Sequence, residues 1–202
     1  MALSLSMAVN RSPQTKPDYF AVYDYKANDR LPLKSDYIWR VESGVVRTLT
    51  WLDNGNIVTL GFWGLGEVLG KGLSPAEPLE AVCLTAVKVT FLPSDQLSQI
   101  HPTLIQQLHQ FQVLLQILHR RPVEVALWEL LVWLSQKFGQ AVEQGQMIGF
   151  HLTHQEIAET IGTTRVTVTR LLRDFEQQNL IQRLPSHQIL IQDKEPLWHY
   201  EI

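Results

Sequence analysis

The chain has 202 residues, of which 45% are hydrophobic and 18% are charged, and its formal net charge is -3. This length allows one domain or two small ones with a real core, so the composition excludes wholesale disorder. No apolar run is long enough to span a membrane, and the apolar stretch near the start is too short for a secretory signal, so we expect a cytoplasmic protein. The acidic balance means that any DNA-binding function must depend on where the basic residues lie.

The sequence has too few cysteines for a disulfide or a cysteine-based metal site, and its first 100 residues contain no histidine. Cys83 is the single cysteine, so we expect a buried small hydrophobe rather than a disulfide, a zinc ligand or an iron–sulfur ligand. All seven histidines fall at residue 101 or later, and a metal enzyme of the cupin type would need histidines on its barrel strands. The sequence therefore predicts no metal, no cofactor and no enzyme, and it makes a cupin-type enzyme the weakest alternative.

Residues 1–18 lack periodicity and predict a flexible tail, and residues 19–100 predict a small β-domain. Short apolar or alternating runs in the β-domain cover 37–41, 45–50, 57–60 and 86–91. Asn54 and Gly55 lie between two of these runs and predict a hairpin turn at 53–56, since both residues accept positive φ. Seven of the 11 glycines lie between Gly44 and Gly72, which is typical of the corners of a sandwich or jelly roll.

Residues 101–121 have a helical period. Their apolar residues are spaced 4, 3, 4, 3, which is the a/d seam of a short coiled coil: Leu104, Leu108, Phe111, Leu115 and Leu118. This pattern predicts a dimerisation helix, although a single helix packed on its own β-domain also fits it. Pro122 ends the helix, because proline blocks a backbone hydrogen bond.

Residues 122–202 read as a helical domain with a β-wing. A helix over 123–138 ends at Gly139, a polar loop runs to Gly149, two helices follow, and an apolar hairpin spans 180–192. The run from Thr153 to Arg173 has the pattern of a helix-turn-helix. Thr153 and Glu156 form a capping box, Gly162 ends the first helix, and Thr163 or Thr164 caps the second. Small and apolar residues form the buried faces: Ile157, Ala158, Ile161, Val168, Leu171 and Leu172.

The second of these helices is expected to enter the major groove of DNA. Arg165 and Arg170 are candidate base readers, because the guanidinium fork matches two acceptors of guanine. The charges from 163 to 184 sum to +2, since four arginines outnumber two acids in that stretch. Other polar residues are candidate contacts to the DNA backbone: Thr163, Thr164, Thr167, Thr169, Arg173, Arg183 and His187.

These residues resemble the bacterial regulators named after the cyclic-AMP receptor protein and the fumarate and nitrate reduction regulator (CRP/FNR). The resemblance covers the β-corner 41–46, the Asn54-Gly55 turn, Gly66-Glu67, the helix from Pro102 and the run LTHQEIAETIGTTRVTVTRLL at 152–172. It implies an α+β fold with an N-terminal jelly roll of the cyclic-nucleotide-binding type, a long dimerisation helix and a C-terminal winged helix-turn-helix.

The run TRVTVTRLL is most similar to the cyanobacterial global nitrogen regulators, which implies a GTA/TAC palindrome. The same resemblance implies phosphate contacts by Gln155, Thr164 and Thr167 and base contacts by Arg165 and Arg170. Val166 stands where many relatives have a glutamate that accepts a hydrogen bond from cytosine, so a TGTGA-type code is not expected.

The β-domain departs from relatives that sense small anions. The stretch GEVLGKGLSPAEPLEAVC has no arginine for a cyclic-nucleotide phosphate, and no Arg or Lys occurs from Pro102 to His119. Glu77 or Pro78 stands where relatives that bind 2-oxoglutarate have an arginine. A bound dianion would be unpaired there, so we expect control by neither cyclic AMP nor 2-oxoglutarate.

The sequence thus predicts a homodimeric transcription regulator that binds a palindromic site in double-stranded DNA. RNA polymerase or a regulatory protein is a further candidate partner. In the alternative interpretation the β-domain is a protein-interaction module, with Trp39, Trp51 and Trp63 as candidate anchors, although tryptophan more often packs in a core.

Overall fold

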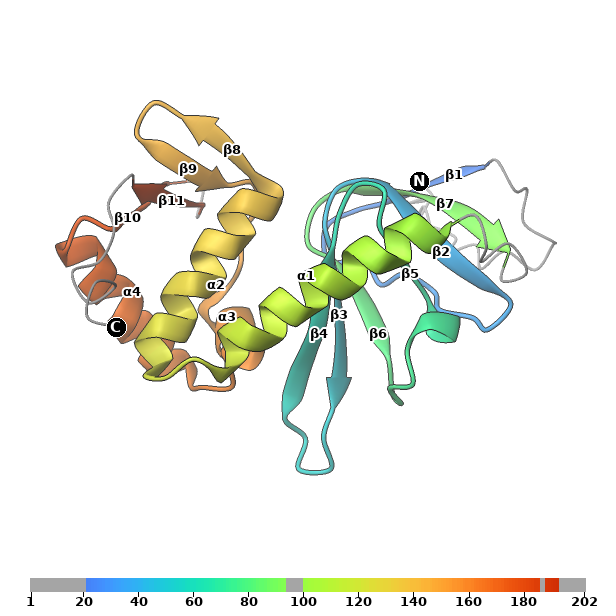
Figure 1. The fold of residues 1–202 in the computed structure, drawn as a ribbon, viewed down its shortest axis with the longest axis horizontal. Coiled ribbons are helices and arrows are strands. Elements are labelled where there is room, and N and C mark those ends of the chain that lie inside the picture. Colours follow the sequence, from blue (N-terminus) through green and yellow to red (C-terminus); the bar gives the residue numbers. More distant parts are fainter. Residues whose placement is uncertain (1–20, 94–99, 186–187, 193–202) are drawn as a thin grey trace, which may run out of the picture.

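The computed structural model describes residues 21–93, 100–185 and 188–192, which form four α-helices, one short 3-10 helix and eleven strands (Figure 1). The predicted tail at 1–18 lies outside these residues. Within them, none of the helices has the length and apolar character needed to cross a membrane. We call strands β1 to β7 the β-unit and elements α2 to β11 the C-terminal unit; helix α1 runs between them (Figure 1).

Two antiparallel sheets form the β-unit. One sheet has four strands, in the order β1 (Val22–Tyr25), β7 (Val87–Pro93), β2 (Tyr37–Ser43) and β5 (Val68–Leu69). The other has three, in the order β4 (Ile57–Trp63), β3 (Val46–Trp51) and β6 (Glu80–Cys83). A 3-10 helix, η1 (Lys71–Leu73), follows β5. Side chains from both sheets share one buried cluster, so the predicted β-domain is confirmed.

The predicted hairpin turn joins β3 to β4. Gly55 has φ +79°, and the side-chain oxygen of Asn54 accepts a hydrogen bond from the Asn56 amide at 3.0 Å. The Leu52 amide donates to the Asn56 carbonyl at 2.9 Å and closes the turn. Asn54 and Gly55 therefore form the hairpin turn that the sequence predicts.

Cys83 and Trp39 both lie in the core of the β-unit. Cys83 is fully buried, as predicted, and burial raises the pKa of its thiol to about 12, with a smaller contribution from Asp29. Trp39 is 1% exposed and donates its indole N–H to the Pro32 carbonyl at 2.8 Å. Trp63 also packs against this core. Trp39 is therefore closed to a partner as a surface anchor, whereas Trp51 and Trp63 are half-buried and their anchor role stays a prediction.

Helix α1 (His101–His119) packs on its own chain by one face only. Gln107, Leu114 and Ile117 are buried, and the Gln107 amide both accepts from the Val68 N–H at 3.0 Å and donates to the Val68 carbonyl at 2.9 Å. The predicted seam is more open: Leu108, Phe111 and Leu115 are 55%, 47% and 45% exposed. Leu104 and Leu118 are half-buried against neighbouring clusters. The predicted domain limits at 19–100, 101–121 and 122–202 stay predictions.

The C-terminal unit is built around α2 (Val123–Phe138), which is buried on most of its surface. The expected polar loop after it is wrong: β8 (Gly139–Val142) and β9 (Gly145–Ile148) form a hairpin. Strand β9 also pairs with β11 (Ile189–Gln192), and β11 with β10 (Ile181–Arg183). The wing hairpin, β10 and β11, therefore belongs to a four-stranded sheet with β8 and β9. Residues 139–148 form strands because this sheet pairs their backbone N–H and C=O groups.

The two units touch directly. Val45 and Phe62 of the β-unit belong to the same hydrophobic cluster as α2, and the rings of Phe62 and Trp133 lie 6.3 Å apart. The Lys137 ammonium group of α2 donates to Glu67 at 2.8 Å and to the Phe62 carbonyl at 3.0 Å. Burial lowers the pKa of Lys137, and Glu67 opposes that shift.

Candidate nucleic-acid interface

Helices α3 (His154–Ile161) and α4 (Arg165–Gln177) form the predicted helix-turn-helix. The Thr153 hydroxyl accepts from the Glu156 amide at 3.2 Å, and the Glu156 carboxylate accepts from the Thr153 amide at 2.8 Å, so the capping box is confirmed. Gly162 ends α3 in the left-handed conformation at φ 68°. Of the two candidate caps of the second helix, Thr164 is the N-cap: its hydroxyl accepts from the Thr167 amide at 3.1 Å.

The buried faces also follow the prediction. Ile157, Ala158 and Ile161 of α3 are at most 4% exposed. Residues of α4 lie against them in the same cluster: Val168, Leu171, Leu172 and Phe175. This packing fixes α4 on α3 by its apolar side and leaves its polar side to the solvent.

Three predicted arginines lie on the exposed part of α4. Arg165 is the first residue of the helix, whereas Arg170 and Arg173 follow in its second and third turns. Arg170 pairs with Asp174 at 3.1 Å, and its side chain stays 65% exposed. An exposed pair of this kind contributes little to stability, so Arg170 can exchange Asp174 for a DNA acceptor at small cost.

The threonines differ in what their hydroxyls already bind. Thr164 and Thr167 share one hydrogen bond at 2.9 Å, so one of the two hydroxyl protons remains for an external acceptor. Thr169 donates to the Arg165 carbonyl at 2.9 Å and lies 2.8 Å from Nδ1 of His154. Its single proton is used inside the protein. Thr163 is half-buried in the turn, where its amide donates to the Ala158 carbonyl at 3.0 Å.

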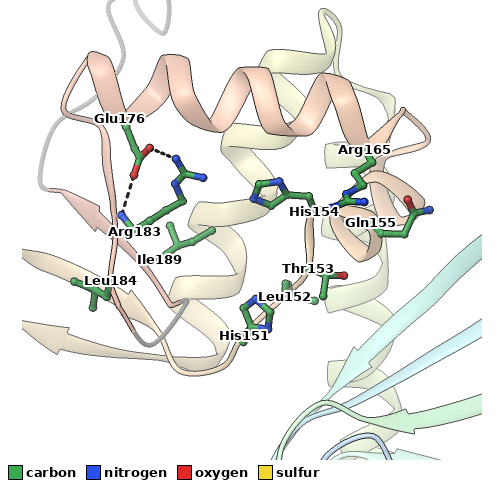
Figure 2. A pocket seen from close by; sticks show the side chains of 10 residues that line it. All are labelled: His151, Leu152, Thr153, His154, Gln155, Arg165, Glu176, Arg183, Leu184 and Ile189. Carbon is green, nitrogen blue, oxygen red and sulfur yellow. Dashed lines mark hydrogen bonds and ion pairs between the residues drawn. The ribbon is translucent and has the colours of Figure 1, made fainter.

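A cleft of about 760 Å³ opens between the start of α3, α4 and the wing (Figure 2). Its polar lining combines predicted site residues with two histidines: His151, Thr153, His154, Gln155, Arg165, Glu176 and Arg183. Arg183 of the wing pairs with Glu176 of α4, which raises the pKa of Arg183 and lowers that of Glu176. The cleft therefore brings Arg165, Arg183 and Gln155 together.

Sequence reasoning missed both histidines of this cleft. Figure 2 shows the His154 ring between Arg183 and Arg165. Burial, followed by Arg183, Arg165 and His151, lowers the pKa of His154. Among the described residues, two arginines and two histidines line this cleft with one carboxylate, Glu176, so it is suited to a phosphate group. The signal in the sequence was the placement of His151 and His154 on either side of the capping threonine.

Two other predicted contacts are placed less directly. The Gln155 amide donates to Glu159 at 3.0 Å, along α3. His187 lies outside the described residues. No group of three or more His, Cys, Asp or Glu side chains suited to a metal ion occurs in the described part of the chain.

Comparisons with known proteins agree with this geometry. Residues 125–200 match the model of the Crp-like helix-turn-helix domain. Regulatory protein CysR of Synechococcus elongatus is 42% identical over 156 residues, which cover 76% of this chain and 75% of that protein. A global nitrogen regulator of Synechocystis is 36% identical over 112 residues, 50% of each chain. A solved CRP-family regulator from Thermus thermophilus has a TM-score of 0.73 at 21% identity, and the match covers 85% of this chain and 92% of that one.

A winged helix-turn-helix joined through a long helix to a β-unit defines a DNA-binding transcription regulator. The chain belongs to the CRP/FNR family of such regulators. Its α+β fold, with an N-terminal jelly roll and a C-terminal winged helix-turn-helix, is the predicted one.

Proposed function

We propose that this regulator acts as a homodimer on a palindromic DNA site and that neither cyclic AMP nor 2-oxoglutarate controls it. The observation that carries the proposal is the open seam of α1. Leu108, Phe111 and Leu115 are about half exposed at heptad spacing, and a second copy of the helix would bury all three. A two-fold axis at this seam would relate two copies of α4, one for each half-site of a palindrome.

In this proposal Arg165 and Arg170 read base edges. Thr164 and Thr167, with Gln155, Arg173 and Arg183, hold the sugar–phosphate backbone. Thr163, Thr169 and His187 are the further candidate contacts to that backbone. The cleft beside Arg165 supports this arrangement, because its arginines and histidines face one region from α3, α4 and the wing. RNA polymerase or a regulatory protein remains the candidate protein partner.

The proposal on ligands draws on a second cavity, of about 540 Å³, between the β-unit and α1. Among the described residues its lining has no charged side chain; the lining includes Trp63, Leu73, Leu104, Leu108 and Phe111. The phosphate of cyclic AMP or the two carboxylates of 2-oxoglutarate would lose hydration there without an ionic partner.

The test is a mobility-shift titration of the full chain on a GTA/TAC palindrome, with light scattering of the same sample. We expect a dimer that binds the palindrome in preference to a shuffled duplex of equal length. A monomer that binds both duplexes equally would overturn the proposal.

A further inference from the structure

Arg47 is a buried charge that the predicted site does not use. It lies on β3, its side chain is 3% exposed, and it contacts polar groups of Thr59 and Glu159. The guanidinium group donates to the Thr59 hydroxyl at 2.7 and 3.0 Å and to the Glu159 carboxylate at 2.7 Å. Glu156 lies 3.8 Å away. A buried guanidinium group is tolerated only with such partners, so its position is tightly specified.

These contacts cross from the β-unit to the helix-turn-helix. Arg47 and Thr59 belong to β3 and β4, whereas Glu159 and Thr160 belong to α3. The hydroxyls of Thr59 and Thr160 lie 2.9 Å apart and form a second link. We call these four residues the Arg47 network. It holds α3 against the β-unit by directional hydrogen bonds, which fix orientation better than apolar packing does.

The network also reaches a predicted DNA contact. Glu159 binds Arg47 through one carboxylate oxygen and accepts from Gln155 through the other, at 3.0 Å. The position of α3 determines that of α4, because the two helices pack through one apolar cluster. In the proposed dimer the seam on α1 sets the two-fold axis. The network then sets how far each α4 lies from that axis.

We propose that Arg47 is a positioning residue, which fixes the separation of the two α4 helices so that the dimer accepts one half-site spacing. This inference rests on the proposed function. Half-sites one helical turn apart must meet two recognition helices at a matching distance. A dimer whose helix-turn-helix units are loosely held can adapt to several spacings, but it loses the advantage of preorganisation.

The test compares palindromes whose central spacer is shortened or lengthened by one or two base pairs, together with a single half-site. Glu159→Gln removes the charge while keeping the size of the side chain, and Thr160→Val removes the second link. We expect the double variant to lose about tenfold affinity on the best spacing and to bind neighbouring spacings almost as well. Its affinity for the single half-site should fall much less than its affinity for the best spacing, because the amide oxygen of the new glutamine can still accept from Gln155.

Arg47→Met is the complementary variant from the β-unit, and Lys88→Gln is the matched control. Lys88 pairs with Asp24 at 2.6 Å inside the β-unit and is 56% exposed, so its loss should leave the spacing profile unchanged. Circular dichroism and light scattering establish that each variant is folded and dimeric. If Arg47→Met does not fold, the Glu159→Gln/Thr160→Val variant decides the question.

Two results would overturn the positioning role. One is a spacing profile in the double variant that matches the wild type. The other is an equal loss on every spacing and on the half-site, which would indicate a purely local effect on α3. A wild type that binds no palindrome would instead overturn the proposed function, and the inference with it.

Discussion

Arginine and threonine side chains share the exposed surface of α4 but differ in what they can read. Arg165→Ala and Arg170→Ala should each weaken binding to the cognate site by about 1 to 3 kcal/mol and relax specificity at one base pair. Thr167→Val should weaken binding to all sequences alike, because a hydroxyl on a phosphate carries no base information. Titrations on single-base variants of the operator measure both effects.

Arg120→Ala is the control for these variants, since Arg120 pairs with Glu129 at 3.0 Å outside the helix-turn-helix. Equal losses on specific and random DNA for Arg165→Ala would reject the base-reading role.

His154 gives DNA binding a dependence on pH. Its pKa is lowered below the ordinary value of 6.5 in the free protein, so the unfolded chain binds protons first on acidification. The free energy of unfolding should therefore fall as pH drops through 6.5 towards the folded pKa. A DNA phosphate in the cleft would raise that pKa, so operator affinity should rise over the same window.

Fluorescence anisotropy from about pH 7.5 to about pH 5.5 measures this affinity, and urea unfolding measures the stability. His154→Gln should flatten both profiles, since the glutamine amide does not titrate in this range but can still hydrogen-bond. His109→Gln, a change on the exposed side of α1, is the control. An operator affinity with the same pH dependence in His154→Gln would remove His154 from the site.

Local signals at single residues were read correctly from the sequence. Thr153, Glu156 and Gly162 act within a few residues of one another, so their roles follow from spacing alone. Arg47 and Glu159 are 112 residues apart in the chain, and no periodicity connects them. The two cleft histidines are an intermediate case. Their positions beside Thr153 could be read from the sequence, but their proximity to Arg183 of the wing could not.

At the level of elements, α1 yields the clearest prediction. Leu108→Asp with Leu115→Asp should produce monomers and abolish specific DNA binding, because two carboxylates would face a second copy across the seam. Light scattering and mobility shifts measure the two outcomes.

Gln106→Asp with Gln116→Asp adds the same charge at exposed positions of α1 off the seam and should leave a dimer. An unchanged dimer in the seam variant would disprove this interface.

The β8–β9 hairpin shows the limit of element prediction. Residues 139–148 alternate poorly and include two glycines, so the sequence favoured a loop. Strand β9 is stabilised instead by its pairing with β11, in which Met147 lies opposite Leu190 and Gln146 opposite Ile191. The helices, by contrast, carry their own caps and apolar periods and were located within a few residues.

For the whole molecule, the unliganded protein should already bind its operator. A ligand shifts a conformational equilibrium only if it binds one state better, and the uncharged cavity gives an anion little reason to bind either state. Operator titrations with and without cyclic AMP or 2-oxoglutarate should coincide. An affinity gain of about tenfold, equal to about 1.4 kcal/mol of coupling, from either ligand would contradict this assignment.

Glu156 belongs to the start of α3 and, through Arg47, to the boundary between the two units. One carboxylate oxygen holds the Thr153 amide at 2.8 Å while the other faces the guanidinium group. We therefore expect an opening of the boundary also to loosen the first turn of α3. The hydrogen-exchange rate of the Thr153 amide should therefore rise with the frequency at which the β-unit and the C-terminal unit separate.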